Sequence, residues 1–127
     1  MGAAAHPVIK KMSPQFLVAD LERAIEFYTK KLGFTIEFRY EDFYAGIIKN
    51  GLSIHLKTSH PLAGIRQLIK ESEHLDLIFS VGDIEWFYKD LLKKAVEVTQ
   101  PLREMPYGRE FYITDPDGYI IAFLEEK

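Results

Sequence analysis

The sequence predicts one α+β domain built from two copies of a βαβββ unit. The first observation is an internal repeat, in which residues 18–22 (VADLE) match residues 81–85 (VGDIE) at an offset of 63 (83 − 20). The second is a pair of turns, Asn50-Gly51 and Asp117-Gly118, at an offset of 67 (118 − 51). The third is the order of elements, which is strand, helix and three strands in each half. Because one unit leaves a sheet face uncovered, we expect the two to pack side by side or to pair across a dimer.

The first half begins with a weakly patterned extension, residues 1–12, and a short strand at Phe16–Val18. A helix is predicted from Leu21 to Leu32, with Asp20 as its N-cap and Gly33 just past its end, because apolar residues recur there at helical spacing. Three strands should follow, with the Asn50-Gly51 turn joining the last two. Their expected ranges are 34–40, 44–48 and 52–56.

The second half repeats this order after a linker at Pro61–Ser72 that carries a short helical piece. A strand over Leu75–Val81 should lead to a helix from Ile84 to about Lys94, with Asp83 as its cap. The remaining predictions are a strand at 96–98, a loop at Pro101–Pro106, a strand at 111–114, a turn at 115–118 and a final strand at 119–124. We therefore expect a single domain over residues 13–127, with modules at about 13–60 and 74–127.

Composition excludes several classes of protein. The chain has 127 residues, of which 47% are hydrophobic, so it can bury a core. Its formal net charge of −3 argues against nucleic acid as a partner, because a phosphate backbone attracts basic surfaces. The absence of cysteine excludes disulfides, thiolate metal sites and a cysteine nucleophile. We see neither a secretory signal nor an apolar run of the ~20 residues that a membrane span needs, and we expect a cytoplasmic protein without a membrane partner.

Three stretches carry a resemblance to a known family. Residues 106–119 (PYGREFYITDPDGY) resemble the closing signature of the glyoxalase/bleomycin-resistance protein/dioxygenase (vicinal oxygen chelate) superfamily. Residues 18–34 resemble its opening signature, and residues 42–46 resemble the corresponding stretch of bleomycin-resistance proteins. The resemblance implies that the two modules form a cupped mixed sheet. It also implies a homodimer, in which a second subunit often completes the groove.

Metal-dependent members of this superfamily place four ligands on inward-facing strand positions. Counting from the helix caps and the turn glycines, the resemblance assigns these positions to Ser13, His55, Asp76 and Ala122. Alanine cannot bind a metal and serine is a poor ligand, whereas a divalent metal site needs about three imidazole or carboxylate donors. We therefore expect no metal and no cofactor. A rearranged site of His55, His74 and Asp76 is the alternative.

A concave sheet without metal suits small-molecule binding. Bleomycin-resistance proteins, which the chain resembles, bind a cationic planar antibiotic between two subunits without catalysis. Aromatic side chains can stack on such a ligand or attract its charge, although aromatic residues in strands more often belong to the core. Arg109 could hold an anionic group or pair with Glu110 or Asp117. The candidate ligand contacts are Phe38, Tyr44, His55, Asp76, Trp86, Arg109 and Phe111.

These observations favour a metal-free protein that binds a small molecule, cationic and aromatic in type, and sequesters an antibiotic or toxic compound. The alternative is an enzyme of the superfamily, a lyase, isomerase or dioxygenase that uses a rearranged metal or His55 as a general base. A third hypothesis, a regulatory or immunity-type partner of another protein, has no specific support in the sequence.

Overall fold

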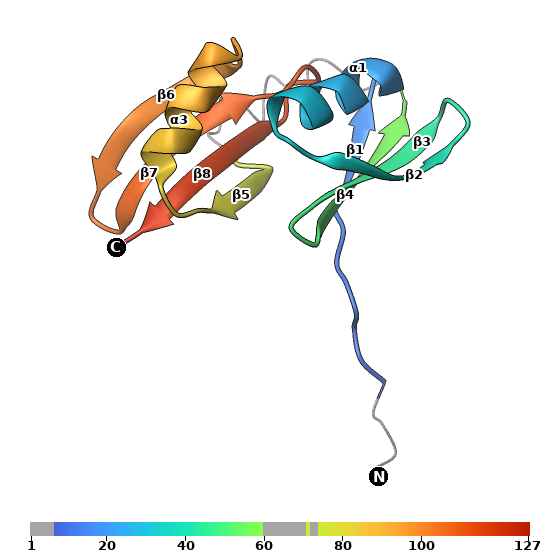
Figure 1. Ribbon diagram of the computed structural model, residues 1–127, viewed down its shortest axis with the longest axis horizontal. Coiled ribbons are helices and arrows are strands. Elements are labelled where there is room, and N and C mark those ends of the chain that lie inside the picture. Colours follow the sequence, from blue (N-terminus) through green and yellow to red (C-terminus); the bar gives the residue numbers. More distant parts are fainter. Residues whose placement is uncertain (1–6, 60–70, 72–73) are drawn as a thin grey trace.

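Two four-stranded sheets lie side by side in the computed structural model, which describes residues 7–59, 71 and 74–127 (Figure 1). The first module comprises β1 (Gln15–Val18), α1 (Leu21–Glu26), η1 (Phe27–Lys31), β2 (Thr35–Tyr40), β3 (Tyr44–Lys49) and β4 (Leu52–Thr58). The second comprises β5 (Leu77–Ser80), α3 (Ile84–Lys93), β6 (Glu97–Met105), β7 (Gly108–Thr114) and β8 (Ile120–Glu126). The prediction of two βαβββ modules is confirmed.

The two sheets have the same topology. The strand orders are β1-β4-β3-β2 and β5-β8-β7-β6. In each sheet the first strand of the module pairs in parallel with the last, and the other pairs are antiparallel. The cup therefore consists of two separate mixed sheets, with β1 and β5 each at an edge.

The helix of the first module begins and ends as predicted. The Asp20 side chain accepts a 3.1 Å hydrogen bond from the Arg23 N–H, which satisfies a free donor of the first turn. The last turn, η1, widens to π-helical geometry, and Gly33 follows with a φ of +81°. The expected helix from Leu21 to Leu32 is thus one helical segment with a wider final turn.

The helix of the second module has a different cap from the predicted one. Asp83 adopts a left-handed conformation, with a φ of +51°, and its side chain makes no capping hydrogen bond. The Glu125 carboxylate at the end of β8 accepts a 3.2 Å hydrogen bond from the Ile84 N–H instead. Asp83 therefore occupies the predicted N-cap position, but its side chain does not cap the helix.

The remaining predictions concern a hairpin turn, a loop and a linker. Asn50 and Gly51 both have a positive φ, +52° and +78°, as the predicted tight hairpin turn requires. The loop predicted at Pro101–Pro106 is wrong, because β6 extends to Met105. Strand β6 lies at a sheet edge and its register shifts on both sides of Gln100, so a proline is tolerated there. The linker predicted at Pro61–Ser72 lies almost wholly outside the described residues.

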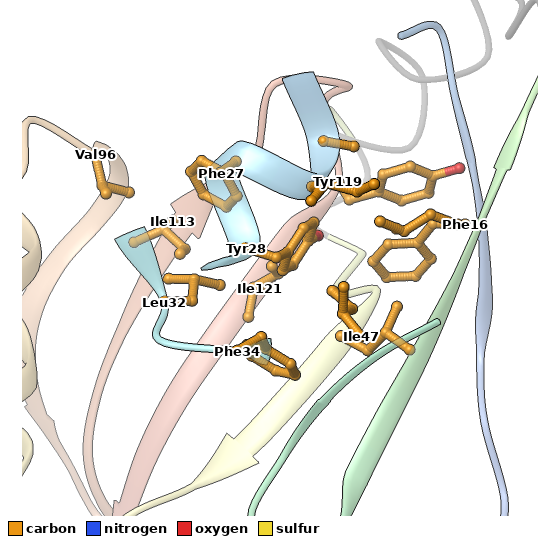
Figure 2. Packing of buried hydrophobic residues seen from close by; sticks show 14 of the residues in the cluster. Phe16, Phe27, Tyr28, Leu32, Phe34, Ile47, Val96, Ile113, Tyr119 and Ile121 are labelled. Carbon is orange, nitrogen blue, oxygen red and sulfur yellow. The ribbon is translucent and has the colours of Figure 1, made fainter. Parts of the chain in front are cut away.

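Each sheet buries one face and leaves the other open. Helix α1 packs against β3 and β4, and α3 packs against β6, β7 and β8. Figure 2 shows the core at the junction of the modules, where the rings of Phe16 and Tyr119 stack with centroids 4.0 Å apart. The Tyr28 hydroxyl also donates a 2.6 Å hydrogen bond to Asp115 across this junction. No helix among the described residues is long and apolar enough to cross a membrane.

Candidate ligand-binding site

The face of the first sheet that points away from α1, which we call the first open face, carries an aromatic cluster. The rings of Phe38 and Tyr44 stack with centroids 6.0 Å apart, and the Phe38 ring meets the His55 imidazole edge-on at 5.1 Å. The centroid of the Tyr40 ring lies 6.5 Å from that of the Tyr44 ring, and Tyr40 is 62% exposed. Neighbouring strands bring these residues together, because Tyr40 pairs with Tyr44, and Gly46 pairs with both Phe38 and His55. The cluster is thus an accessible aromatic surface around one imidazole.

A short chain of hydrogen bonds orients His55. The Gln15 amide nitrogen donates to the Tyr44 hydroxyl at 3.0 Å, and this hydroxyl lies 2.9 Å from His55 Nδ1. Because the Tyr44 oxygen accepts from Gln15, its own proton is available for Nδ1. In neutral His55 this arrangement places the ring proton on Nε2. The first open face therefore offers a positioned N–H donor among aromatic rings.

Gly46 allows the Phe38 ring to lie over the sheet. A Cβ added at Gly46 would overlap Phe38 Cε2 and come within 2.7 Å of Cδ2 and Cζ. Gly46 is buried although it belongs to the open face, because the ring covers it. Gly46, Tyr40 and Gln15 are not among the ligand contacts predicted from the sequence. A glycine inside a strand pattern is the available signal for the first of these, since it often marks a close approach.

The corresponding face of the second sheet, the second open face, contains a buried carboxylate. Glu110 is 4% exposed and accepts hydrogen bonds from Arg103, from the Tyr107 hydroxyl at 2.6 Å and from the Tyr112 hydroxyl at 3.0 Å. Burial alone would raise the pKa of the Glu110 carboxyl, but these donors outweigh burial and hold the pKa below its ordinary value. Glu110 is therefore a charged, fully partnered anchor.

Beside this anchor the second open face is hollowed. The hollow has a volume of about 350 Å³. Arg103 and Tyr112 form part of its wall, and the Arg103 guanidinium lies 5.6 Å from the centre of the Tyr112 ring. The lining residues are His74, Leu75, Thr99, Gln100, Arg103, Tyr112 and Ile120.

The four positions at which metal-dependent members of the superfamily carry ligands do not form a metal site in this chain. Ser13 precedes β1 and His55 lies on β4, both in the first module, whereas Asp76 precedes β5 and Ala122 lies on β8, both in the second. One Asp76 oxygen accepts the Ile120 N–H at 2.8 Å, and the other lies 3.6 Å from His74 Nε2. Among residues 7–59, 71 and 74–127, no three His, Cys, Asp or Glu side chains gather as a metal site would require.

The ligand contacts predicted from the sequence lie in different parts of the molecule. Phe38, Tyr44 and His55 come together on the first open face, and Asp76 lies at the edge of the second sheet. Phe111 has no exposed surface and stacks on Phe123 in the core, so a ligand on either open face cannot touch it. Arg109 lies on the helix side, where it binds Glu85 at 2.8 Å and Glu125 at 2.6 Å. Trp86 is 57% exposed on α3, near the junction of the modules.

Comparison with known proteins identifies the family. Residues 9–123 match the Glyoxalase/Bleomycin resistance protein/Dioxygenase superfamily, and the chain belongs to this superfamily. No curated protein matches the chain.

Solved structures share the fold at low sequence identity. UcmS2 superposes with a TM-score of 0.78 at 20% identity, over 94% of this chain and 100% of that one. TnmS3, an antibiotic binding protein from Streptomyces sp. CB03234, superposes with a TM-score of 0.73 at 19% identity, over 97% of this chain and 100% of that one. The bleomycin-binding protein from Streptomyces verticillus, solved with copper(II)-bleomycin, superposes with a TM-score of 0.71 at 20% identity, over 96% of this chain and 100% of that one. At these identities the similarity establishes the fold alone.

Proposed function

We propose that the chain is a metal-free small-molecule binding protein that captures a flat, amphipathic aromatic compound of the antibiotic type on its open faces. The observation that carries this proposal is the exposed aromatic cluster of Phe38, Tyr40 and Tyr44 around His55. Stacking and burial of flat rings supply affinity, and the imidazole N–H supplies one directional contact.

A cationic group on the ligand suits this surface. The faces of phenylalanine and tyrosine rings attract cations. Glu37 adds a carboxylate at the margin of the cluster, where it accepts hydrogen bonds from Ser53 and Lys11. The net charge of −3 adds only a weak, salt-dependent attraction. The antibiotic-binding and bleomycin-binding proteins that share the fold support the same class of ligand.

Two copies of the chain would complete the site. Each open face ends at an edge strand, β1 or β5. The Tyr119 hydroxyl binds the Leu17 backbone on β1, whereas the outward backbone groups of an edge strand such as β5 can bind a neighbouring chain. We propose a homodimer in which the first open face of one subunit lies opposite the second open face of the other. Two-fold symmetry then creates two equivalent grooves. Each would combine the His55 cluster with the hollow beside Arg103.

Calorimetric titration with bleomycin and a panel of aromatic cations tests the proposal. We expect at least one compound to bind with a Kd below about 100 μM, which corresponds to ~5.5 kcal/mol. Phe38→Ala should abolish the signal, whereas Leu92→Ala, which truncates a half-exposed side chain on α3, should preserve it. Absence of binding across the panel would refute the antibiotic-binding proposal. Recovery of a chemically altered ligand would instead favour an enzyme.

A further inference from the structure

The internal repeat creates two equivalent junctions between the modules. Residues 63 positions apart make reciprocal contacts: Lys31 Nζ donates to the Lys94 carbonyl, and Lys94 Nζ donates to the Lys31 carbonyl at 3.2 Å. This exchange shows that the modules are related by an approximate two-fold axis. Each β-hairpin turn should therefore meet the first strand of the other module in the same way.

One junction is filled by an aromatic side chain. Tyr119 follows the Asp117-Gly118 turn, and its ring lies parallel to that of Phe16 on β1, within 5°. Its hydroxyl accepts from the Leu17 N–H at 2.8 Å and donates to the Leu17 carbonyl at 2.9 Å. Tyr119 thus closes this side of the molecule by stacking on Phe16, as Figure 2 shows, and by binding the backbone of an edge strand.

The other junction lacks this ring. Leu52 takes the place of Tyr119 (119 − 67), and Phe79 takes the place of Phe16 (16 + 63). Leu52 is 60% exposed, and a cavity of about 450 Å³ lies beside it. The aromatic residues of the cavity wall are Phe34, Phe79, Trp86, Phe87 and Phe123.

The cavity wall also offers an edge strand. Ser80 on β5 takes the place of Leu17 and lines the cavity. The Val81 N–H bonds to Leu124 on β8, and backbone groups of successive strand residues point to opposite sides. The Ser80 N–H and carbonyl therefore point away from β8, as those of Leu17 do where they bind Tyr119.

The charged residues around the cavity are mainly basic. Lys31, Lys49 and Lys94 line it, and the one carboxylate that the described residues contribute is Asp90, which pairs with Lys94 at 2.8 Å. Lys49 Nζ donates to the Leu32 carbonyl at 2.8 Å and lies 6.0 Å from the centre of the Phe87 ring. Lys49 also pairs with Leu52 across the hairpin, so both side chains leave the sheet on the same side. Among the described residues Lys49 has no carboxylate partner, so an ammonium group held by the Leu32 carbonyl stands beside the gap that Leu52 leaves.

We propose that this cavity is a second binding site, for a small aromatic acid. The ring of the ligand takes the place of Tyr119 and stacks on Phe79, while its carboxylate binds Lys49. A phenolic hydroxyl on the ring reaches the Ser80 backbone. The proposal is independent of the open faces, which lie on another side of the sheets and are proposed to bind a cation.

Trp86 is the single tryptophan and lines the cavity, so its fluorescence reports occupancy directly. We expect para-hydroxyphenylpropionate to change this fluorescence saturably, with a Kd below about 1 mM. Phenylpropionate, which lacks the hydroxyl, should bind more weakly. Tyramine, which carries an amine in place of the acid, should give no saturable change. Equal binding of the acid and the amine would overturn the proposal.

Substitutions at the gap separate this site from the rest of the protein. Leu52→Tyr rebuilds the filled junction, so it should abolish binding of the acid and raise the melting temperature, whereas Leu52→Met should do neither. Lys49→Met should weaken binding of the acid by about tenfold, and Lys89→Gln, on the same helix as Trp86 but outside the cavity wall, should not. Melting curves confirm that each variant is folded.

Two outcomes would overturn the assignment. Retained binding in the Leu52→Tyr variant would place the acid elsewhere. If the acid leaves the Trp86 fluorescence unchanged and the Leu52→Tyr variant has a different oligomeric state, the cavity is an interface between copies of the chain. Neither outcome affects the titration with aromatic cations, so failure here is distinguishable from failure of the proposed function.

Discussion

The ring of Phe38 lies directly over Gly46 on the neighbouring strand, in space that a side chain at Gly46 would occupy. This contact holds the ring flat on the first open face, where it stacks with Tyr44 and meets His55 edge-on. The absent side chain on β3 thus shapes the aromatic surface as much as the aromatic residues do.

Gly46→Ala should therefore weaken ligand binding. The added methyl group displaces the Phe38 ring, and the loss of one aromatic contact should raise the Kd about three- to tenfold. Gly46 does not have a positive φ, so the backbone itself accepts alanine. Gly82→Ala is the matched control, because a Cβ there meets nothing within 4 Å. Calorimetry on both variants measures the effect, and equal affinities would remove Phe38 from the site.

Much of the fold could be predicted because its signals are local. The order of elements within each unit of the repeat, the Asn50-Gly51 turn and the Asp20 cap each depend on residues close together in sequence, and the structure contains all three. The cap of α3 could not be predicted in this way. Its carboxylate comes from Glu125, 41 residues from Ile84, and only the folded second sheet brings the two together.

The candidate site was predictable to a smaller extent. Of the candidate contacts, Phe38, Tyr44 and His55 lie together on the first open face, whereas Phe111 and Arg109 lie on the covered face of β7. Both faces of this strand carry an aromatic side chain, Phe111 on one and Tyr112 on the other, so alternation alone does not show which one faces the core. The pairing of β7 with β8 decides this, and it depends on residues distant in sequence.

The proposed homodimer predicts a particle of about 29 kDa, twice the chain mass of 14.7 kDa. Light scattering during size-exclusion chromatography measures this mass. Leu17→Lys places a charge on the first open face at the edge strand β1, where Leu17 is 38% exposed, and should shift the protein toward the monomer. Leu92→Lys makes the same change on α3 and should leave the dimer intact. A wild-type monomer at every concentration would contradict the proposed groove.

Because Ser13, His55, Asp76 and Ala122 do not form a metal site, we expect weak, non-stoichiometric binding of Zn²⁺, Mn²⁺ and Ni²⁺ to tag-free protein. His55 is engaged by Tyr44, and one Asp76 oxygen is engaged by the Ile120 N–H, so these residues have fewer free donors than a metal site needs. Metal analysis after dialysis gives the stoichiometry. One tightly held metal per chain, lost in both His55→Ala and Asp76→Ala, would contradict this and favour the enzyme alternative.

The Asp115 carboxyl predicts a pH dependence of stability. Burial raises its pKa from 3.8 to about 6, although the Tyr28 hydroxyl and the N–H groups of Asp117 and Tyr119 all donate to it. The folded protein therefore holds this proton more tightly than the unfolded chain does. The resulting stabilisation is complete below a pH of about 4 and is lost as the pH rises through about 6.

Asp115→Asn should remove this dependence, because the amide stays neutral throughout the range. From a pH of about 4 to about 7, the free energy of unfolding of the wild type should lose roughly 3 kcal/mol relative to that of the variant. Other carboxyls, such as Glu37 and Glu125, have pKa values lowered by hydrogen bonds from Lys11 and Arg109. Their protonation destabilises the fold at lower pH, and it does so equally in both proteins. Urea denaturation across this range measures the difference. Parallel curves for the two proteins would show that Asp115 titrates normally and that burial does not control its charge.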